Sequence, residues 1–561
     1  MMYRSAFMAA LVVTAGVAFG GCATPAAVPA PAAPAPGGAA APTAATAAAV
    51  TPKVNRVVMI TTPPTRTTLE MRHMSETYSW MLRPMYDFLV VVNPQTGKLE
   101  PGVATAWGWE PNGKSVRFKL RPATPFHNNG GVATAADMKF VSEQLSLSDS
   151  LHGQAPYWRS TVQAVEIVND NEFIYHLKQT DGNFVTAISE QQGGAEIQSK
   201  ASYDKAGPAK YAAGPLNGTG PYQYLAGAEA QYMRYQRTPF THWRAKPEFP
   251  EFEFRFAKEA STRQAALLTG EAHIAQLPAD LEAQVEKQGM QTLHGSFPGI
   301  RVYGNFHCCY LNDPLDPSKG FKWPNSPLMD PRVRQAINRS LNRDELNKAL
   351  YGGKGDMMFV NHMNPSRPGW NTAWEKAWKE SYSYDPAAAK KLLADAGKTG
   401  FKVGISVLAT TGVAGGEDLA EAAAGYMRAV GIDAQLQNID PLEQDSKQRG
   451  LAFDSQISFA ATASDIWTGW YIRNSSLATR GGLEDPDLDK LLRTIVTTTD
   501  EKKRDDLWRQ VGDTALPRFV NITLFWLPVE ASINPKIVAG WVYPGTITGG
   551  YTHVWNIKPA P

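Results

Sequence analysis

The 561-residue chain has only three cysteines, and two of them are neighbours. Cys22, Cys308 and Cys309 cannot form the paired framework that holds small secreted domains together. Cys308 and Cys309 could close a strained vicinal bridge, or they could remain as one buried thiol beside a reduced or otherwise paired one. We expect the second arrangement, and a fold that is held by hydrophobic cores.

Neither sign of charge is in excess. The chain has 55 Lys and Arg against 53 Asp and Glu, which leaves a net charge of +2. This balance gives no support for a nucleic-acid partner, which would favour a strongly basic surface. Beyond the N-terminus, no segment approaches the ~20 apolar residues of a transmembrane helix. We therefore expect the body of the protein to lie outside the bilayer.

The sequence also lacks the common catalytic motifs. Neither His-Glu-x-x-His nor Gly-x-Ser-x-Gly occurs. Ala396-Gly397-Lys398-Thr399 resembles the end of a phosphate-binding loop, but Leu392 replaces the required earlier glycine. His307 to Cys309 offer metal-binding atoms, yet neighbours in a strand point to opposite faces. We expect a protein that is not an enzyme and binds neither a cofactor nor a metal.

The first residues have the composition of an export signal. Arg4 supplies one positive charge before the stretch Ala6 to Phe19, which is too short to cross a bilayer, so residues 1–21 read as a cleaved signal. Cys22 then follows two glycines, as in the lipobox of bacterial lipoproteins, although Phe19 stands where that motif usually has Leu. We expect a lipid on Cys22; the alternative is ordinary cleavage a few residues later, which would discard Cys22.

A composition change separates this region from the body. Residues 22–53 are almost wholly Ala, Pro, Thr, Val and Gly, which predicts a solvated tether without a core. The remaining roughly 500 residues exceed the usual size of a single hydrophobic core. Two or more lobes are therefore expected.

Two periodicities alternate along the body. Apolar residues at every second position predict strands at Ser115–Arg121 and Glu251–Phe256, and a hairpin over residues 165–177 that turns at Asn169–Asn171. Asp330-Pro331 and Asp385-Pro386 each place an N-cap acceptor before a proline, which predicts a helix after each pair.

A β-α-β unit is predicted further along the chain. Residues 401–409 read as a strand, 417–430 as a helix that stops at Gly431, and 432–436 as a second strand. Connections this short favour parallel pairing of the two strands. The body is therefore expected to be mixed α/β.

Short motifs follow one another through the body in a fixed order. Leu99-Glu100-Pro101 precedes Trp107, Phe118-Lys119-Leu120-Arg121 ends a strand, and Thr134-Ala135-Ala136-Asp137 opens a helix. Further motifs are Asn112-Gly113-Lys114-Ser115, Phe126-His127, Gly218-Thr219-Gly220-Pro221-Tyr222, Arg263 to Ala275, Asp330 to Arg343, Tyr384 to Gly397, Val430-Gly431-Ile432 and Asp485 to Leu492.

In this order and spacing, the chain resembles family 5 of the bacterial extracellular solute-binding proteins, from about Val54 to the C-terminus. The resemblance implies a periplasmic-binding-protein-like α/β fold of type II, with two lobes of mixed sheets and helices joined by hinge strands. Lobe 1 would comprise residues 54–299 and 518–561, with an extra subdomain at about 80–205, and lobe 2 would comprise 300–517. The hinges would lie at Val302–Phe306 and Phe519–Trp526.

The same resemblance implies a function. Such a protein is the substrate-binding component of an ABC importer, a monomer in the periplasm that encloses a peptide or similarly sized organic solute between its lobes. It delivers the solute to a permease, which works with separate ATPase subunits. A solute-sensing receptor, or a periplasmic hydrolase or chaperone on the same scaffold, remains the alternative.

Candidate ligand-binding residues follow from the family pattern. Peptide binders of the family pair an Asp, in a Trp-x-x-Asp context, with the ligand's ammonium group. Asp465 occupies the matching region, but Thr462 stands in place of the Trp, and Asp465 could instead cap a helix that begins at Ile466. Aromatic rings could stack on a flat or apolar ligand. The other candidates are Trp467, Trp470, Tyr471, Tyr222, Asn305, Arg66 and His73.

Overall fold

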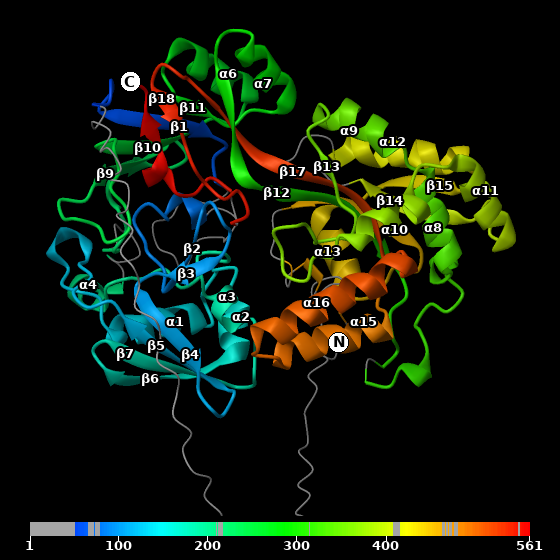
Figure 1. Ribbon diagram of the computed structural model, residues 1–561, viewed down its shortest axis with the longest axis horizontal. Helices are drawn as coiled ribbons and strands as arrows, with labels where there is room; N and C mark the ends of the chain where they lie inside the picture. The colour runs from blue at the N-terminus through cyan, green and yellow to red at the C-terminus, as the bar shows by residue number, and fades with distance from the viewer. Residues whose placement is uncertain are drawn as a thin grey trace, which may run out of the picture. The chain divides into compact units, whose positions relative to one another are not determined.

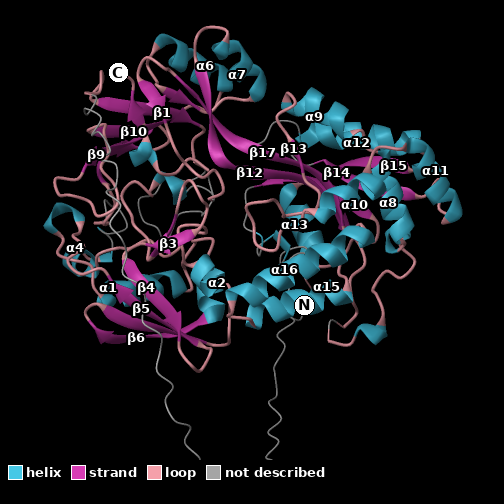
Figure 2. Cartoon of the chain, viewed as in Figure 1, coloured by secondary structure: helices cyan, strands magenta, loops and turns pink. Residues whose placement is uncertain are grey.

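The computed structural model describes residues 51–64, 72, 79–208, 210, 217–313, 315–407, 416–462, 466, 469–470, 474–475, 481–547 and 550–561. The predicted signal, Cys22 and most of the predicted tether lie outside these ranges. Figures 1 and 2 show how the helices and strands of the chain are arranged. In the described ranges, no helix combines the length and the apolar character that crossing a membrane requires.

One large mixed sheet runs through the body. Its central pair is β12 with β17, which are antiparallel and long, whereas β1 pairs in parallel with both β10 and β11. In spatial order the strands are β15 (Asp433–Asn438), β14 (Lys402–Val407), β16 (Gln456–Thr462), β12 (Gln291–His307), β17 (Asn521–Ile533), β11 (Ile274–Ala275), β1 (Arg56–Thr61), β10 (Glu251–Phe256), β9 (Tyr232–Arg237) and β8 (Tyr222–Ala228), with β13 (Asp356–Met357) on β17.

A separate antiparallel sheet occupies the N-terminal half. Its strands follow the order β4 (Ala104–Trp109), β5 (Ser115–Leu120), β7 (Glu172–Leu177) and β6 (Val162–Asn169). The predicted hairpin is confirmed, since β6 and β7 pair around the turn at residues 170 and 171. Two short pairs join β2 (Val90–Val92) to β3 (Leu99–Pro101) and β18 (Val538–Gly540) to β19 (Lys558–Pro559).

The predicted helix starts are confirmed by their caps. The Asp330 side chain accepts a hydrogen bond from the Arg332 amide, and the Asp385 side chain accepts one from the Ala388 amide. The helices are α1 (Ala135–Ser146), α2 (Ala155–Thr161), α3 (Phe184–Ala187), α4 (Lys200–Ala206), α6 (Ala260–Thr269), α7 (Ala279–Glu286), α8 (Pro331–Ser340), α9 (Arg343–Tyr351), α10 (Ala373–Tyr382), α11 (Pro386–Asp395), α12 (Gly416–Ala429), α13 (Pro441–Arg449), α15 (Pro486–Thr497) and α16 (Glu501–Ala515).

The predicted β-α-β unit is also confirmed. β14 and β15 pair in parallel from Lys402↔Asp433 to Val407↔Asn438, and α12 connects them. Gly431 adopts a φ of 92°, which a side chain would strain, and this explains why a glycine stands between helix and strand.

The buried apolar residues form two large clusters. The first cluster combines residues from Val57 to Ile274 with C-terminal residues from Val529 to Ile557. The second cluster spans Val302 to Leu527 without interruption from the other. Along the chain, the last residue of the second cluster is Leu527, and the C-terminal residues of the first cluster begin at Val529.

Cys308 and Cys309 differ from the expectation, because they form a disulfide with each other. Both residues are buried, and Cys309 has a left-handed backbone with a φ of 59°. β12 ends at His307, so the alternation of side chains along a strand, which would separate the two sulfurs, does not extend to this pair.

Substitution Asp385→Ala should lower the free energy of unfolding by about 1 kcal/mol, because it removes the acceptor that caps α11. Asp385→Asn is the matched control and should retain most of the stability, since Asn caps equally well. Urea denaturation, followed by far-ultraviolet circular dichroism, measures both. Equal losses for the two variants would mean that the charge of Asp385, rather than its cap, matters.

Candidate functional site

The two clusters are connected by the pairing of β12 with β17. The register runs from Gln291↔Ile533 to Asn305↔Asn521, so both strands pass from the first cluster into the second side by side (Figure 1). On its second-cluster half, β12 also pairs with β16, from Arg301↔Thr462 to His307↔Gln456. This crossing is where a solute held between the clusters would meet ordered backbone.

A polar group of side chains lies at this crossing. Arg301 on β12 is 2% exposed, and its Nη1 donates a hydrogen bond to the imidazole of His362, 3.0 Å from Nε2. The Arg301 guanidinium lies 4.6 Å from the centre of the Tyr303 ring, a favourable cation–π distance. The His362 ring is 5.6 Å from the ring of the buried Trp470. We call Arg301, Tyr303, His362 and Trp470 the crossing cluster.

Several neutral polar atoms beside the crossing cluster are buried without a hydrogen-bond partner. In the described chain these include Nε1 of Trp470, both amide atoms of Asn361 and Nδ2 of Asn364. Asn305 is similar: its Oδ1 accepts a long bond of 3.5 Å from Asn521, while its Nδ2 has no partner. An unpaired buried polar group costs about 1–3 kcal/mol, so such groups are expected to have water or ligand atoms as partners.

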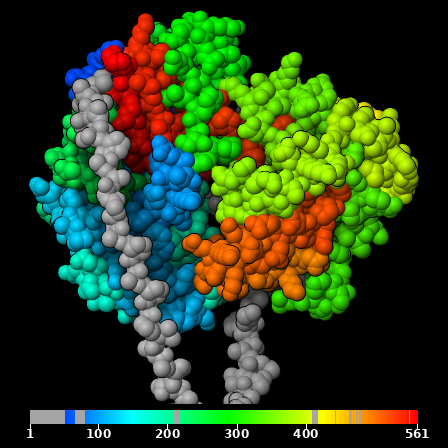
Figure 3. Space-filling model, in the orientation of Figure 1, coloured from blue at the N-terminus to red at the C-terminus, as the bar shows by residue number. Residues whose placement is uncertain are grey.

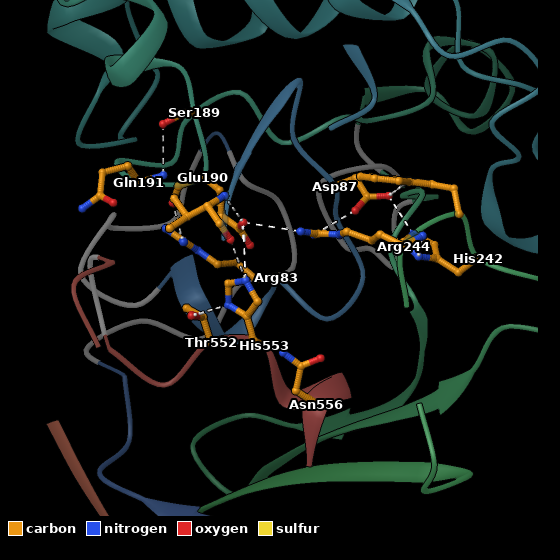
Figure 4. Close-up of polar contacts among 12 residues, drawn as sticks. Arg83, Asp87, Ser189, Glu190, Gln191, His242, Arg244, Thr552, His553 and Asn556 are labelled. Carbon is orange, nitrogen blue, oxygen red and sulfur yellow. Dashed lines mark hydrogen bonds and ion pairs between the residues drawn. The ribbon is translucent and has the colours of Figure 1, made fainter. Parts of the chain in front are cut away.

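A second polar group lies wholly within the first cluster (Figure 4). The Asp87 carboxylate accepts hydrogen bonds from His242 Nε2 at 2.9 Å and Trp243 Nε1 at 3.1 Å, and forms an ion pair with Arg244 at 2.9 Å. Arg244 also contacts Glu190 at 3.4 Å. Residues from three distant parts of the chain meet here, which fixes their relative positions. We call this group the buried charge network.

Three further residues contact Glu190 and extend the buried charge network: Arg83, Val92 and His553. Arg83 Nη1 donates to the carbonyl oxygen of Glu190 at 2.6 Å, and Glu190 Oε2 accepts from the Val92 amide at 3.0 Å. His553, eight residues before the last residue of the sequence, lies 3.8 Å from Glu190. Burying charges without partners would be prohibitively costly, and here each charge has an opposite one nearby.

No group of three or more His, Cys, Asp or Glu side chains in the described ranges is placed to hold a metal ion. His307, which the sequence analysis considered, is instead used inside the second cluster. Its Nε2 hydrogen-bonds Ser458 Oγ at 2.7 Å and its Nδ1 hydrogen-bonds the Gly481 carbonyl oxygen at 2.9 Å. That the protein binds no metal stays a prediction.

Comparison with known proteins identifies the family. The family model described as "Bacterial extracellular solute-binding proteins, family 5 Middle" matches residues 98–482. The chain belongs to this family. The resemblance noted in the sequence is therefore confirmed.

Individual relatives of known name share about a quarter of their aligned residues with this chain. The dipeptide-binding protein of Escherichia coli (strain K12) is 27% identical over 347 residues, which are 58% of this chain and 60% of that protein. Heme-binding protein A of Haemophilus influenzae (strain ATCC 51907 / DSM 11121 / KW20 / Rd) is 26% identical over 57% of this chain and 58% of its own length. The chain thus spans less than two thirds of these two relatives.

The solved structure of HbpA2 from Haemophilus parasuis superposes with a TM-score of 0.73 at 21% identity, covering 90% of this chain and 100% of that one. At this identity the likeness concerns the fold alone. The fold of this family 5 protein is the type II periplasmic-binding-protein-like α/β fold, with two lobes joined by hinge strands, as the sequence indicated.

Of the predicted ligand-binding residues that the structure describes, two lie at the crossing and one lies elsewhere. Trp470 and Asn305 lie at the crossing. Tyr222 lies in the first cluster, where its hydroxyl donates to the Phe249 carbonyl oxygen at 3.0 Å, so it joins neither of them. The remaining predictions fall outside the described residues: Asp465, Trp467, Tyr471, Arg66 and His73.

The glycines before Tyr222 have a packing reason. A Cβ at Gly218 would overlap the Met85 carbonyl oxygen, and one at Gly220 would lie 2.6 Å from the Pro84 carbonyl oxygen. The Gly220 amide donates to Met85 at 3.0 Å. These glycines therefore allow close contact with the segment that carries Arg83 and Asp87.

Arg301 and His362 were missed by the sequence analysis. Arg301 directly precedes the predicted hinge Val302–Phe306, so a charged residue at a hinge end was a usable signal. No comparable sequence signal pointed to His362, because its neighbours along the chain do not indicate that the segment folds back onto β12.

Burial shifts several pKa values in the first lobe. Burial lowers the pKa of His127, His152 and His553 to about 4 each, and raises the pKa of Glu196 to about 7. Burial alone would raise the pKa of Asp87, but His242 and Arg244 outweigh it and hold the pKa at about 2. The Asp87 carboxylate is thus charged at every pH at which the protein would function.

The free energy of unfolding should fall as the pH drops from 6.5 to about 4. Over this range His127, His152 and His553 stay neutral in the folded protein but become protonated in the unfolded chain, whose histidines titrate near 6.5. Each contributes up to about 1.4 kcal/mol per pH unit. Glu196 and Glu282, whose pKa values are both raised to about 7 mainly by burial, act in the opposite sense between pH 4.5 and 7, because their folded forms retain the proton, and together they offset two of the three histidines.

Urea denaturation at pH 6.5, 5.5 and 4.5 measures this slope. His152→Gln and His553→Gln should each make the slope shallower. A stability that is constant across these pH values would contradict the assignment of neutral buried histidines.

Proposed function

We propose that this protein is the substrate-binding component of an ABC importer, which encloses a peptide or similarly sized organic solute between its lobes and delivers it to the permease. The observation that carries the proposal is the crossing of β12 and β17 between two separate hydrophobic clusters, with buried polar atoms left without partners beside it. A solute that contacts both lobes favours their closure, because only differential contacts shift an equilibrium.

Lobe 1 in this proposal comprises residues 54–299 and 518–561, with an extra subdomain at about 80–205, and lobe 2 comprises residues 300–517. The proposed location is the periplasm, where the protein is a monomer anchored by a lipid on Cys22. The protein performs no catalysis itself. Its partners are the permease and the ATPase subunits.

The ligand in this proposal lies against the crossing cluster. Trp470 and Tyr303 offer aromatic rings, and the unpaired Nδ2 atoms of Asn361 and Asn364 offer donors to carbonyl or carboxylate oxygens. Asp465 belongs to the same segment as Trp470 and would pair with a ligand ammonium. Trp467 and Tyr471 are proposed as further stacking residues.

Native mass spectrometry of freshly purified protein tests whether a solute is enclosed. Thermal and urea denaturation with Ala-Ala, Ala-Ala-Ala or haem should then reveal a ligand class, because a ligand at 100 times its Kd adds about 2.7 kcal/mol to the free energy of unfolding. No bound mass and no stabilisation with any of these probes, together with product formation from a peptide, would replace the binding function by a hydrolase.

Asp465→Asn should weaken a peptide that carries a free ammonium group and leave its N-acetylated analogue unaffected. The reason is that only the charged ligand loses an ion-pair partner, a loss worth 10-fold or more, about 1.4 kcal/mol. Isothermal calorimetry with Ala-Ala-Ala and N-acetyl-Ala-Ala-Ala measures the difference. Asp454→Asn, at an exposed site in the same region, is the control. Equal affinity of Asp465→Asn and wild type for the free peptide would remove the ammonium role.

Asn361→Leu separates ligand binding from stability. Both amide atoms of Asn361 are buried without a partner, so an apolar side chain of similar size should keep or raise the free energy of unfolding. Affinity for Ala-Ala-Ala should fall about tenfold if the amide donates to the ligand. Unchanged affinity in a stable Asn361→Leu protein would remove Asn361 from the site.

A further inference from the structure

The two lobes make a second contact, away from the crossing strands. The loop at Asp181–Gly182 of lobe 1 meets the turn between α15 and α16 of lobe 2 (Figure 1). The Gly182 amide donates to the Val496 carbonyl oxygen at 2.6 Å. In return, Arg504 Nη1 donates to the Gly182 carbonyl oxygen at 2.5 Å. Figure 3 shows α16 and its neighbours facing the N-terminal half of the chain. We call Asp181, Gly182, Val496, Thr498 and Arg504 the interlobe contact.

A glycine is required at the centre of the interlobe contact. A Cβ at Gly182 would overlap the carbonyl oxygen of Thr498 and lie 3.4 Å from that of Ile495. Both obstacles are backbone atoms, which cannot move aside as a side chain can. The fit between the two backbones therefore depends on the absence of a side chain, and any other residue would separate them.

The lobe 1 loop is held in place before it reaches lobe 2. Tyr157 donates its hydroxyl proton to Asp181 Oδ2 at 2.7 Å, and Asp181 Oδ1 accepts from the Asn183 amide at 2.9 Å. Phe184, two residues beyond Gly182, is fully buried in the first cluster. The loop thus presents the two Gly182 backbone groups in a fixed orientation.

The lobe 2 side is equally ordered. Ile495 and Trp508 anchor α15 and α16 in the second cluster, and the Asp500 side chain caps α16 by accepting from the Lys503 amide. Burial lowers the pKa of Arg504, and the nearby carboxylates, of which Asp181 has the largest effect, counteract this. Burial raises the pKa of Asp181, and the hydrogen bonds from Tyr157 and the Asn183 amide, with the charge of Arg504, counteract it.

We propose that the interlobe contact stabilises the closed form of the protein and slows release of the bound solute, whatever the chemistry of that solute. This inference rests on the proposed function, because it assumes that the lobes open and close. The two hydrogen bonds of Gly182, one to the Val496 carbonyl oxygen and one from the charged Arg504 side chain, exist only when the lobes approach. Because these hydrogen bonds are present in the closed form and absent from the open one, they shift the equilibrium toward closure without contacting the ligand.

The first test measures lobe separation without any added solute. Spin labels on Lys119→Cys in lobe 1 and Lys379→Cys in lobe 2, both at exposed positions, report the distance between lobes by pulsed dipolar spectroscopy. Gly182→Ala and Arg504→Ala should shift the distribution toward longer distances. Gly108→Ala, whose Cβ would meet nothing within 4 Å, and Arg509→Ala, exposed on the same helix, are the matched controls and should not.

The second test measures release. For Ala-Ala-Ala and for haem alike, whichever binds, Gly182→Ala and Arg504→Ala should raise the dissociation rate about tenfold and leave the association rate nearly unchanged. A change in the dissociation rate of one solute alone would show that these residues contact that ligand, and it would overturn the proposal. Distance distributions of both variants that match wild type would overturn it as well.

The two proposals fail in distinguishable ways. If none of the probes binds but the variants still lengthen the interlobe distance, the interlobe contact holds and the solute class is wrong. If the probes bind and close the lobes in wild type and in both variants to the same extent, the solute-binding function stands and the interlobe contact does not contribute. Thermal denaturation of each variant shows whether the lobes themselves remain folded.

Discussion

The antiparallel pairing of β12 with β17 is the constraint on which the rest of this structure depends. Two strands that cross together share a ladder of backbone hydrogen bonds, so neither lobe can shift along the other without breaking several bonds at once. Bending and twisting of the pair cost far less, and the register irregularities between His294 and Ile300 mark where the ladder is already interrupted. The pairing therefore leaves bending and twisting as the relative movements of the two lobes that break the fewest of these hydrogen bonds.

Much of the fold could be predicted because its signals are local. The caps at Asp330 and Asp385, the alternation along β5 and β10, and Gly431 between α12 and β15 each reflect the chemistry of a few consecutive residues. The order of short motifs then identified the family. Neither step required knowledge of which distant segments meet.

The site was harder to predict, because its residues are brought together by the tertiary fold. His362 contacts Arg301 across 61 positions of sequence, and nothing local to either residue predicts the pair. Asn305 was proposed from its place at a crossing strand and lies there, whereas Tyr222 was proposed from a turn whose glycines serve backbone packing. The disulfide of Cys308 with Cys309 was one of two arrangements that the sequence left open, and the other one was expected, because adjacency alone does not show whether the local backbone permits the bridge.

The discontinuity of lobe 1 has a consequence for the order in which the protein folds. Lobe 2 is built from one uninterrupted stretch of chain and can complete its core as soon as Leu527 is available. Lobe 1 cannot, since its core includes Trp541, Tyr543 and Trp555, and its buried charge network includes His553. The N-terminal half, although synthesised first, must wait for the last residues of the chain before its charges at Arg83, Asp87 and Glu190 are all enclosed. During synthesis the core of the earlier half thus stays incomplete, and a chain cut short before Trp541 would lack Trp541, Tyr543 and Trp555 of that core.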